Sequence, residues 1–555
     1  MLQQASAALR AQFSPQPGTL LTRVLQLDDL MAKRDAALDD PTANFYDGAL
    51  RRLGIGWHCP ATQTARIPKT GPLILVANHP TGFADGLILG SLLALVRPDF
   101  KFLGNAMLSD MAPAGSVICL NLSETRAAVV ENARALRQAL QWLGRGGAVI
   151  VFPSGEVASF DWPARRVREP AWKDTAARLA MSVGATVVPV GITGTNSVTF
   201  HAAGLAHPRL RTALLVREAL NKPGTTLQVK LGRPLPPERL TAWGEAAEVI
   251  QHLEWRSQLL SSAPTRPVAA PHLAIVPAQS CAAVAAEVSA LPALIEQGHY
   301  AVYSAVATQI PHTLREIGRL REVTFRGIGE GTGAALDLDR FDTHYQHLFL
   351  WNHQKKEVIG AYRVARTNPV LSSQGPEGLY TGSLFRITPA FFAQTGPALE
   401  LGRSFVRQEY QGEFAPLHLL WKGIGALIKQ NPEIRTLFGA VSISNGYSRA
   451  SQTLMAQYLR RHRWHAALAA VVTPRCSSPV PSSRFTPASL DEVADLVEDV
   501  ESDGKGLPVL LRHYLNLNGQ AVALHRDRKF SNVLDALVVV ELDRMPPKMK
   551  ARYLA

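Results

Sequence analysis

Three short runs of apolar, mostly β-branched residues constrain the fold of this chain more than any other feature. They open the segments 73–85, 146–159 and 184–197, and apolar residues with helical spacing lie between them, as at 172–183. Strands that are apolar on both faces belong in a sheet covered by helices on both sides. Their alternation with helices predicts an α/β domain with a largely parallel sheet and its chemistry in the loops at the strand ends. Pro189 lies in the third run, and we expect it to interrupt that strand.

The first run ends in a histidine that is followed by an aspartate. Asn78-His79-Pro80 follows the strand directly, and five residues separate His79 from Asp85. An imidazole titrates near neutral pH and can take a proton from a hydroxyl group. A neighbouring carboxylate can fix its tautomer. An isolated pair of this kind is more often a surface histidine beside a helix-capping aspartate. The assignment of His79 as a base therefore depends on the segments that follow.

The second run ends in a loop built from proline and glycine. Its sequence is Phe152-Pro153-Ser154-Gly155-Glu156. Proline and glycine break the strand and expose backbone N–H groups, with Glu156 at the lip of the loop. The N–H groups near Gly155 are therefore candidates for stabilising an oxyanion.

Together these segments resemble the glycerolipid acyltransferase family, which includes the lysophosphatidate acyltransferases, over roughly residues 70–240. In that family an Asn-His-x4-Asp block supplies a base and its orienting carboxylate. A Phe-Pro-Glu-Gly block helps to bind the acceptor, and a Val-Pro-Val/Ile block packs beneath. The matching residues here are Asn78, His79 and Asp85; Phe152, Pro153 and Gly155; and Val188, Pro189 and Val190. The resemblance implies that His79 deprotonates an acceptor hydroxyl group and that Asp85 orients it.

The sequence departs from the family's pattern in ways that bear on the acceptor. Five residues instead of four separate His79 from Asp85, and the acidic residue Glu156 follows Gly155 instead of preceding it. The segment 115–124, where the family has an arginine for the acceptor's phosphate, contains no arginine. This absence argues against a phosphorylated acceptor such as lysophosphatidate.

The length of the chain predicts more than this one domain. With 555 residues it has room for about two to four domains. Four prolines among small residues at 261–279 indicate a boundary, and no site motif of the first half recurs afterwards. We predict a first domain at 1–260, a Pro/Ala-rich linker with a helix at 261–300, and a second α/β domain at 301–555.

The second half opens with a helix and a glycine-rich loop. The segment 310–333 begins as an amphipathic helix and contains the run from Arg326 to Gly331. This run resembles the loop that cradles the coenzyme A pyrophosphate in GNAT acetyltransferases. That loop, however, follows the central strands, whereas this run precedes them, and a glycine-rich loop alone is weak evidence. We interpret it mainly as a flexible turn.

A series of charged residues in the second half resembles the acyl-homoserine-lactone synthases, whose fold is GNAT-like and whose donor is acyl-carrier protein. The pattern is Arg-x3-Phe, Asp-x2-Asp, a strand arginine and Glu-x2-Arg. It falls on Arg321 and Phe325, Asp339 and Asp342, Arg363, and Glu400 and Arg403. We expect the last two one helical turn apart or on a turn from strand to helix. The alternative is that these residues form ion pairs that only hold loops together.

Segments after residue 417 resemble the ornithine N-acyltransferases and the haemolysin-like chains, and the whole arrangement resembles the bifunctional ornithine lipid synthases. This resemblance implies two steps. The second domain transfers a 3-hydroxyacyl group from acyl-carrier protein to the α-amine of ornithine, and the first domain acylates the 3-hydroxyl group of the resulting lyso-ornithine lipid. The partners implied are acyl-carrier protein, carrying the phosphopantetheine thioester, and the two substrates. No bound cofactor and no metal are expected.

The resemblance also suggests roles for individual residues of the second domain. Glu400 is the candidate base, acting directly or through water. Arg363 and Arg403 would hold a carboxylate or position acidic residues, and Arg321 and Phe325 would line the path of the phosphopantetheine or acyl chain. Several alternatives stay open. The amino acid acylated could be glycine, lysine or glutamine, the chain could be a membrane-active haemolysin, or one half could be a scaffold only.

Charge and composition bear on partners and location. The net charge of +13 is spread evenly, with 27 basic and 20 acidic residues in positions 1–265 and 31 and 25 in the remainder. This excess suits an anionic membrane surface or an acidic partner, or is simply solvated. Nucleic acid is less favoured, because no arginine-rich run is interleaved with aromatic residues. Four unpaired cysteines, no signal-peptide pattern and no apolar run near twenty residues predict a cytoplasmic enzyme, peripheral at the inner face of the membrane.

Overall fold

The computed structural model divides the chain into two compact units. It describes residues 27–554 apart from 41–43, 106–108, 110–111, 122–124, 207–213, 216, 263–271, 528–529 and 531. The first unit comprises Met1–Ala263 and Glu498–Gly504, and the second comprises Pro264–Val497 and Lys505–Ala555. The division falls in the proline-rich segment 261–279, much of which lies outside the described residues, as does part of the segment 115–124.

The first unit is built on a seven-stranded sheet. Neighbouring strands are parallel except for the pair β8 and β9. The strands in spatial order are β1 (Gly56–His58), β9 (Thr226–Leu231), β8 (Thr186–Ile192), β2 (Leu73–Ala77), β5 (Ala148–Val151), β3 (Phe100–Asn105) and β4 (Val117–Leu120). The largely parallel sheet predicted from the three apolar runs is therefore present, and those runs form its centre.

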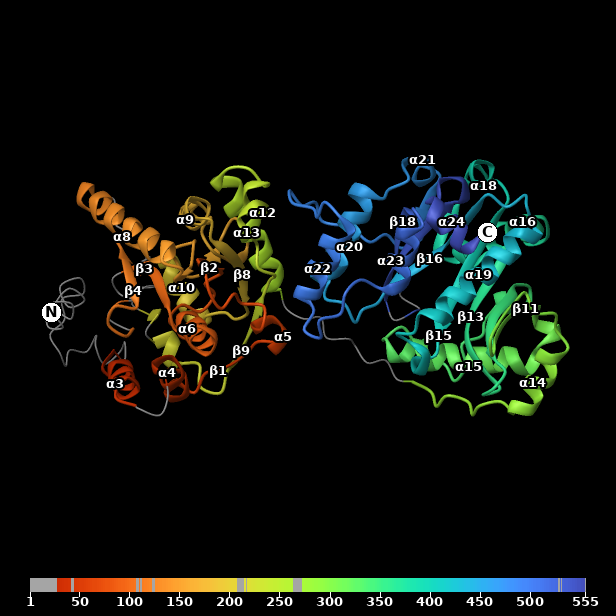
Figure 1. Ribbon diagram of the computed structural model, residues 1–555, viewed down its shortest axis with the longest axis horizontal. Coiled ribbons are helices and arrows are strands. Elements are labelled where there is room, and N and C mark those ends of the chain that lie inside the picture. Colours follow the sequence, from red (N-terminus) through yellow and green to blue (C-terminus); the bar gives the residue numbers. More distant parts are fainter. Residues whose placement is uncertain are drawn as a thin grey trace. The chain divides into compact units, whose positions relative to one another are not determined.

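Helices cover both faces of this sheet (Figure 1). The central strand β2 shows the arrangement, because Leu73, Leu75 and Ala77 pack into one buried core and Ile74 and Val76 into the other. The first core includes α4 (Phe45–Leu53) and α6 (Phe83–Val96), and the second includes α8 (Arg126–Gly144), α9 (Thr175–Val183) and α13 (Ala246–Leu260). The remaining elements are α3 (Leu27–Leu38), α5 (Ala61–Thr64), β6 (Ser159–Asp161), β7 (Arg166–Arg168), α10 (Val198–Ala206) and α12 (Pro237–Thr241).

The prediction that Pro189 interrupts its strand is wrong. Strand β8 runs through this proline, which pairs with Val76 of β2, and its carbonyl oxygen accepts a hydrogen bond from the N–H of Gly232 at 2.9 Å. The ladder between β8 and β9 covers only Val190–Ile192. The missing N–H group of Pro189 therefore removes no bond from that ladder, which is why the strand tolerates it.

The second unit contains an eight-stranded sheet that is antiparallel except for the pair β15 and β16. The strands in spatial order are β10 (Ile295–Gln297), β11 (Tyr300–Val306), β12 (Gln346–Asn352), β13 (Glu357–Arg366), β15 (Ala398–Val406), β16 (Thr436–Ile443), β19 (Val533–Glu541) and β18 (Gln520–Asp527). The parallel pairing covers only residues 398–400 and 436–438, although both strands continue. Beyond this point the backbone N–H and C=O groups of β15 and β16 that face each other make no ladder hydrogen bonds between the two strands.

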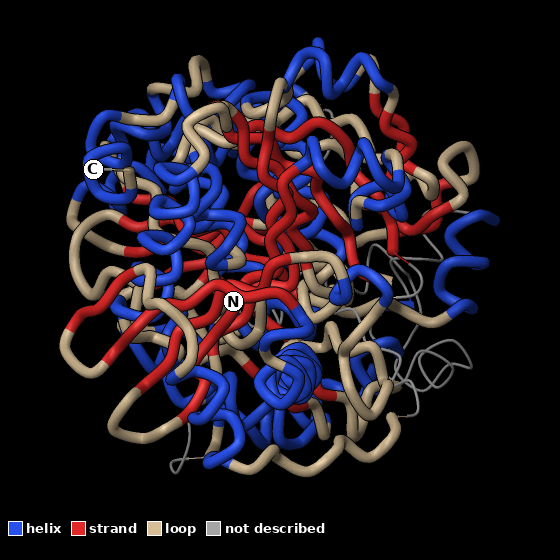
Figure 2. Tube along the Cα trace, turned by 90° about the vertical axis from the view of Figure 1, so that its right-hand side faces the viewer, coloured by secondary structure: helices blue, strands red, loops and turns tan. Residues whose placement is uncertain are grey.

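Adjacent residues of β16 show the two layers that enclose this sheet. Leu437 packs with Trp421 of α19 (Phe414–Gln430) and Leu459 of α20 (Arg449–His462). Phe438 faces the opposite layer, together with Phe385. In Figure 2 the strands run through the interior and the helices lie around them. Because side chains alternate along a strand, one apolar run serves both layers.

The remaining helices and short strands of the second half complete these layers. They are α14 (Cys281–Ser289), α15 (Pro311–Gly327), α16 (Thr367–Gln374), α17 (Tyr380–Leu384), β14 (Phe385–Ile387), α18 (Pro389–Thr395), α21 (Ala466–Ala469), β17 (Val472–Pro474), α22 (Leu490–Val500), α23 (Val509–Asn516) and α24 (Pro547–Tyr553). We assigned α14 and β10 to a linker from the sequence. The structure places them in the second unit, where Val284 and Val288 of α14 share a core with Ile317 of α15.

The glycine-rich run after α15 is bordered by hydrogen bonds to one carboxylate, and its interpretation as a flexible turn stays a prediction. The buried carboxylate of Glu322 accepts hydrogen bonds from the N–H groups of Thr332 and Gly333, at 3.2 and 2.9 Å, and it also binds Arg326. The side chain of Glu330 within this run is 4% exposed. A single carboxylate of α15 therefore organises the loop.

No helix among the described residues has the length and apolar character needed to cross a membrane.

Candidate active sites

The histidine and aspartate of the first unit meet at the junction of β2 and α6. His79 Nδ1 and Asp85 Oδ2 lie 3.0 Å apart, and Asp85 is fully buried. The same carboxylate accepts hydrogen bonds from the N–H groups of Thr81 and Gly82, at 2.8 and 2.9 Å, and from the Thr81 hydroxyl group. Asp85 thus caps α6 and orients the imidazole, and the longer spacing does not prevent the contact. A proton on Nδ1 leaves the lone pair of Nε2 for an acceptor hydroxyl group.

The residues of the second block form the wall beside His79. The ring of Phe152 stacks on the imidazole, with centroids 4.1 Å apart and planes inclined by 23°. Gly155 has a φ of +70°, which favours glycine, and its N–H group donates to the carbonyl oxygen of Phe152 at 3.0 Å. That N–H group is therefore used within the turn, and the proposal that N–H groups near Gly155 stabilise an oxyanion stays a prediction for its neighbours. Glu156 is exposed at the lip, as expected.

A lysine that the sequence analysis missed lies beside this turn. The ammonium group of Lys173 lies 3.8 Å from the position that a Cβ atom on Gly155 would occupy. The backbone N–H of Lys173 donates to the carbonyl oxygen of Pro153 at 3.0 Å. Lys173 therefore places a positive charge next to the turn, although it follows Gly155 by eighteen residues and belongs to no recognised motif.

Asn78, predicted to bind substrate, is engaged with the neighbouring strand. Its side-chain amide donates to the carbonyl oxygen of Ile192 at 2.9 Å and accepts from the N–H of the same residue at 2.7 Å. This pair of bonds joins the end of β2 to the end of β8. The amide of Asn78 therefore fixes the loop that carries His79, with one of its two N–H donors and one oxygen lone pair used for this purpose.

Glu169 is a further neighbour of His79 that the sequence did not reveal. It accepts a hydrogen bond from the backbone N–H of His79 and another from the indole N–H of Trp172 at 2.8 Å. Burial raises the pKa of Glu169, and the hydrogen bond from His79 acts in the opposite direction. Ninety residues separate Glu169 from His79, so no local pattern could have connected them.

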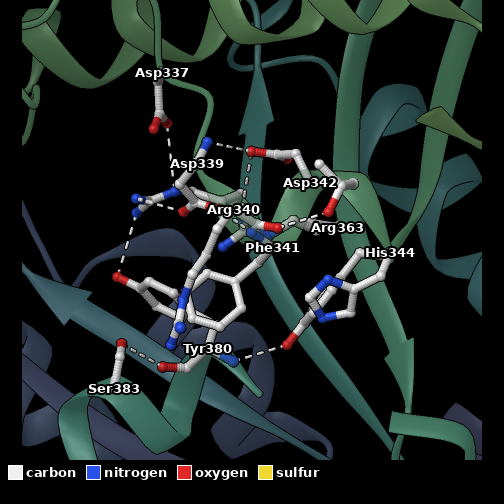
Figure 3. Close-up of polar contacts among 12 residues, drawn as sticks. Asp337, Asp339, Arg340, Phe341, Asp342, His344, Arg363, Tyr380 and Ser383 are labelled. Carbon is white, nitrogen blue, oxygen red and sulfur yellow. Dashed lines mark hydrogen bonds and ion pairs between the residues drawn. The ribbon is translucent and has the colours of Figure 1, made fainter. Parts of the chain in front are cut away.

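In the second unit, a network of ion pairs unites four of the predicted positions. Arg321 of α15 binds Asp342 at 2.7 Å, and Arg363 of β13 binds Asp339 at 2.6 Å and Asp342 at 3.2 Å. Both arginines are fully buried. Figure 3 shows Asp339 and Asp342 turned toward Arg363, with Phe341 and Tyr380 beside it. Burial opposes ionisation of Asp342, but Arg321 and Arg363 outweigh it and hold the pKa of Asp342 well below its usual range.

This network changes the roles proposed for several residues. Arg321 has an exposed fraction of zero and is committed to Asp342, so it does not line a path for the donor. Phe325 is also buried and packs edge-on against Phe530, with centroids 5.8 Å apart. For Arg363 the structure supports the second of the two proposed roles, which was to position acidic residues. A buried ion pair of this kind is costly to break, at about 3–5 kcal/mol.

Glu400 and Arg403 both lie on strand β15, which corrects the expectation of a helical turn or a turn from strand to helix. Opposite β13, Arg363 pairs with Gly402 and Ala361 pairs with Phe405, so β15 contains one extra residue there. Arg403 has a φ of +48°, as is typical of a bulge. The guanidinium of Arg403 lies 3.4 Å from Asp337 and 3.7 Å from Asp339.

The carboxylate of Glu400 is surrounded by donors. It is 1% exposed and accepts hydrogen bonds from the hydroxyl group of Tyr345 and from the N–H groups of Thr381, at 2.6 Å, and Tyr380, at 3.2 Å. The last two belong to the first turn of α17, whose own capping residue, Leu379, offers no side-chain bond. Glu400 therefore caps α17 and is not paired with Arg403. The arrangement favours a positioning residue over a base.

Open space lies next to these groups on β15. A Cβ atom added to Gly402 would meet no other atom within 4 Å. Gly402 lies between Glu400 and Arg403, where β15 no longer pairs with β16. The hydroxyl group of Tyr380 lies 3.4 Å from Arg403, so the same tyrosine is held at its backbone by Glu400 and at its hydroxyl end by Arg403.

Three polar residues near Arg403 were missed by the sequence analysis. Ser442 of β16 donates to Glu330 at 2.7 Å, and Asp535 of β19 is the cross-strand partner of Ser442. Burial raises the pKa of Glu330 to about 7, against the lowering effects of Ser442 and Arg403, and raises the pKa of Asp535 well above its usual value. A lone aspartate inside the apolar run 533–541 was the available signal for Asp535.

The described residues contain no group of three or more histidine, cysteine, aspartate or glutamate side chains placed to hold a metal ion.

Comparison with protein families identifies a different type of acyltransferase domain in each half. Residues 60–193 match the model of the family described as Acyltransferase, and residues 320–422 match that of the Acetyltransferase (GNAT) domain. Each half of the chain therefore contains a region that matches an acyltransferase family model. The prediction of a mixed α/β fold, with a glycerolipid-acyltransferase-like domain followed by a GNAT-like domain, is confirmed.

Single relatives share only part of the chain. A glycine N(alpha)-acyltransferase from Bacteroides thetaiotaomicron is 37% identical over 173 residues, which are 29% of this chain and 51% of the relative. The chain thus spans about half the length of the curated relatives that it matches.

Solved structures resemble parts of the chain only distantly. A 1-acyl-sn-glycerophosphate acyltransferase, PlsC, from Thermotoga maritima is 18% identical, with a TM-score of 0.26, and covers 46% of this chain and 92% of its own. FeeM, an N-acyl amino acid synthase from uncultured soil microbes, is 11% identical, with a TM-score of 0.25. It covers 45% of this chain and 95% of its own.

Proposed function

We propose that the chain makes a lipid from an amino acid in two acylation steps. The second unit attaches a 3-hydroxyacyl group to the α-amine of ornithine, and the first unit acylates the 3-hydroxyl group of that product. The observation that carries the proposal is the presence of two unlike acyltransferase domains, each with its own set of polar residues, in one chain. A first domain that acylates hydroxyl groups needs a hydroxyl-bearing product from the second.

For O-acylation, the first unit holds the groups that the reaction requires. Nε2 of His79 takes the proton of the acceptor hydroxyl group while Asp85 stabilises the imidazolium that forms. The oxygen attacks the thioester carbonyl, and the carrier thiol leaves. The ammonium group of Lys173 lies where it can stabilise negative charge beside the turn at Gly155. The segment 115–124 contains no arginine for a phosphate, in keeping with a neutral acceptor hydroxyl group.

For N-acylation, strand β15 provides the place where donor and acceptor would meet. The donor in this proposal is the thioester of acyl-carrier protein, because the phosphopantetheine arm carries amide groups that can bond to unpaired strand backbone. Such backbone is present where β15 and β16 diverge, and Gly402 leaves open space there. Glu400 holds Tyr380 in place at this point, so we assign it a positioning role.

Lipid analysis tests the proposal as a whole. The full chain is expressed in a bacterium that lacks amino-acid lipids, and its lipid extract is analysed by mass spectrometry. We expect an amide-linked 3-hydroxyacyl ornithine and its O-acylated form. The absence of any acylated amino acid from cells that contain folded protein would overturn the proposal.

Glycine is the second candidate acceptor, because the relative from Bacteroides thetaiotaomicron is named for glycine. The same extracts distinguish the two, since the acylated glycine and acylated ornithine differ in mass and charge. An extract with glycine lipid alone would leave the two-step scheme in place and correct its substrate.

We further propose that the hairpin β6–β7 of the first unit touches an anionic membrane surface. Trp162 is 63% exposed and packs edge-on against Phe160, and Arg165 and Arg166 are exposed beside it. Tryptophan and arginine suit the interface of an anionic bilayer. The hairpin begins next to Ala158, whose N–H group donates to the carbonyl oxygen of His79 at 2.9 Å. A lipid hydroxyl group would thus meet His79 near the surface.

Flotation with vesicles tests this contact. The full chain should float with vesicles that contain phosphatidylglycerol more than with phosphatidylcholine alone, and Trp162→Ser should float less. Val129→Ser is the matched control, since Val129 is 69% exposed on α8. Equal flotation of the two variants would refute the assignment to the hairpin.

A further inference from the structure

Two buried carboxylates in the second unit lack the partners that such groups normally have. Glu330 and Asp535 are each 4% exposed, and Oδ2 of Asp535 is buried with no hydrogen-bond partner. Glu330 accepts one bond, from Ser442. No ion pair of the described residues includes either carboxylate. A buried carboxylate without a counter-ion is costly, so such a site either takes up protons or awaits a cation.

The pairing of β16 with β19 brings the two carboxylates close together on one face of the sheet. Ser442 and Asp535 are direct cross-strand partners, and such residues have Cβ atoms about 4.5–5.5 Å apart. The hydroxyl group of Ser442 reaches Glu330 at 2.7 Å. Both side chains therefore meet on the face of β16 and β19 that also carries Phe438 and Val539. They converge from a loop and a strand that lie about two hundred residues apart in the sequence.

Arg403 joins this pair of carboxylates to the rest of the site. It is electrostatically coupled to both Glu330 and Asp535, but its ion pairs go to Asp337 and Asp339. The positive charge of Arg403 is therefore already shared among other aspartates. The residue that precedes Arg403 on β15 is Gly402, and the space beside Gly402 is open. A small acceptor bound beside Gly402 would lie near the guanidinium of Arg403 and near the two carboxylates.

We propose that Glu330 and Asp535 form a subsite for the side-chain ammonium group of the acceptor. The proposal rests on the N-acylation proposed above and narrows its substrate to amino acids with a second amine, such as ornithine or lysine. The side-chain ammonium supplies the counter-charge that the protein leaves out, while the α-amine faces the thioester. Glycine has no group for this subsite.

Acceptor competition in the purified full chain tests the subsite. The donor is a 3-hydroxyacyl thioester of acyl-carrier protein, and the acceptors are ornithine, norvaline and glycine. Norvaline matches ornithine without the terminal amine. We expect kcat/KM for ornithine to exceed that for norvaline by about 10- to 100-fold, the size expected for a charged hydrogen bond.

Two conservative variants locate the effect. Asp535→Asn and Glu330→Gln should each lower the ratio of ornithine to norvaline by about 10-fold, with the norvaline rate kept within about 3-fold. Asp491→Asn, at an exposed carboxylate of the same unit, should leave the ratio unchanged. Should Asp535→Asn not fold, as judged by its melting curve, Glu330→Gln and Ser442→Ala decide the question.

The outcomes separate this inference from the proposed function. Transfer to glycine or norvaline as fast as to ornithine overturns the subsite and leaves N-acylation standing. An unchanged ratio in folded Glu330→Gln does the same. Absence of transfer to any amino acid overturns both.

Discussion

The two candidate active sites differ in how far their parts are separated along the chain. In the first unit, seven consecutive residues contain both His79 and Asp85, and one turn brings them within 3.0 Å. In the second unit the polar residues come from α15, from several strands and from loops between residues 321 and 535. A local motif therefore predicted the histidine–aspartate pair of the first site, whereas Glu169 beside it and the whole of the second site depend on tertiary structure.

The sites also differ in how they treat charge. Asp85 is buried, but its imidazole partner remains partly exposed, with 18% of the His79 side chain accessible. The arginines at 321 and 363 are fully buried, Asp342 is 4% exposed at its side chain, and Asp339 is 28% exposed. Residues that look like reactive groups in a sequence pattern can thus be parts of a buried scaffold. In the first site the accessible member is the imidazole that would react, whereas in the second it is Asp339, a partner of the buried Arg363.

The largest effect is expected from removing the central arginine of the scaffold. Arg363→Leu leaves Asp342 with Arg321 alone and Asp339 with the more distant Arg403, and breaking a buried pair costs about 3–5 kcal/mol. We expect the second unit to unfold or to melt much earlier in calorimetry, and N-acylation to disappear. Arg366→Leu, at the exposed end of the same strand, is the control and should melt nearly as the wild type does. A folded, active Arg363→Leu protein would show that the network is dispensable.

The next largest effect concerns the first site. His79→Ala removes the base and should lower O-acylation by about 10²- to 10⁴-fold, so that the singly acylated lipid accumulates. Asp85→Asn should reduce O-acylation less but also destabilise the first unit, because three other donors depend on this carboxylate. Lipid extracts and melting curves measure the two effects. Undiminished diacyl lipid in His79→Ala would remove His79 from the mechanism.

Glu400→Gln should lower stability and N-acylation together. A glutamine places an NH₂ group among three donors, and one unsatisfied buried donor costs about 1–3 kcal/mol. For a unit of this size we expect a melting temperature lower by roughly 2–4 °C per kcal/mol. Glu377→Gln, near the same helix but 63% exposed at its side chain, is the control. Normal melting with N-acylation lost would instead restore Glu400 as the base.

The smallest effect is a difference in the pH dependence of stability. The pKa of Glu330 is raised from about 4.5 to about 7, so the folded state binds more protons than the unfolded state between these values. The stabilisation of the folded state by this proton uptake is complete below about pH 4.5 and is lost as the pH rises through about 7. Glu330→Gln mimics the protonated acid, and its melting temperature should therefore fall less than that of the wild type between pH 5.5 and 8.

The groups that face Glu330 define how this experiment is interpreted. Ser442 and Arg403 lower its pKa, and Asp535, whose own pKa is raised by burial, keeps part of the slope in the variant. Asp491→Asn should retain the slope of the wild type. A slope in Glu330→Gln equal to that of the wild type would mean that Glu330 is ionised throughout this range.

Much of the fold followed from apolar patterning, because strands buried on both faces leave a strong signal. The runs at 73, 148 and 186 form the centre of the first sheet as predicted. Pro189 was misjudged because its tolerance depends on where the ladder with β9 begins. The bulge on β15 could not be foreseen, since the spacing of Glu400 and Arg403 fits a helix as well as a distorted strand.

The candidate residues were predicted in position more reliably than in role. The pattern from Arg321 to Arg403 did select residues that meet, but not whether a carboxylate would receive three donors, as Glu400 does. Glu169, Lys173 and Asp535 were missed for a related reason. Each acts on a partner far away in the sequence, and such contacts exist only after the sheets have formed.

The extra residue at Arg403 changes which residues of β15 point to each face of the sheet. Side chains on a strand alternate with a period of two, so one inserted residue exchanges the two faces for everything that follows it. Ahead of the insertion the strand presents Glu400 to α17, and beyond it Phe405 enters the core with Phe349. Removing one residue here would restore regular alternation, so Phe405 would stay opposite Ala361. Arg403, if retained, would lie opposite Tyr362, turn toward the other layer and leave its aspartates. The length of this segment is therefore as strictly determined as its chemistry, and grafts between related chains must preserve the count as well as the residues.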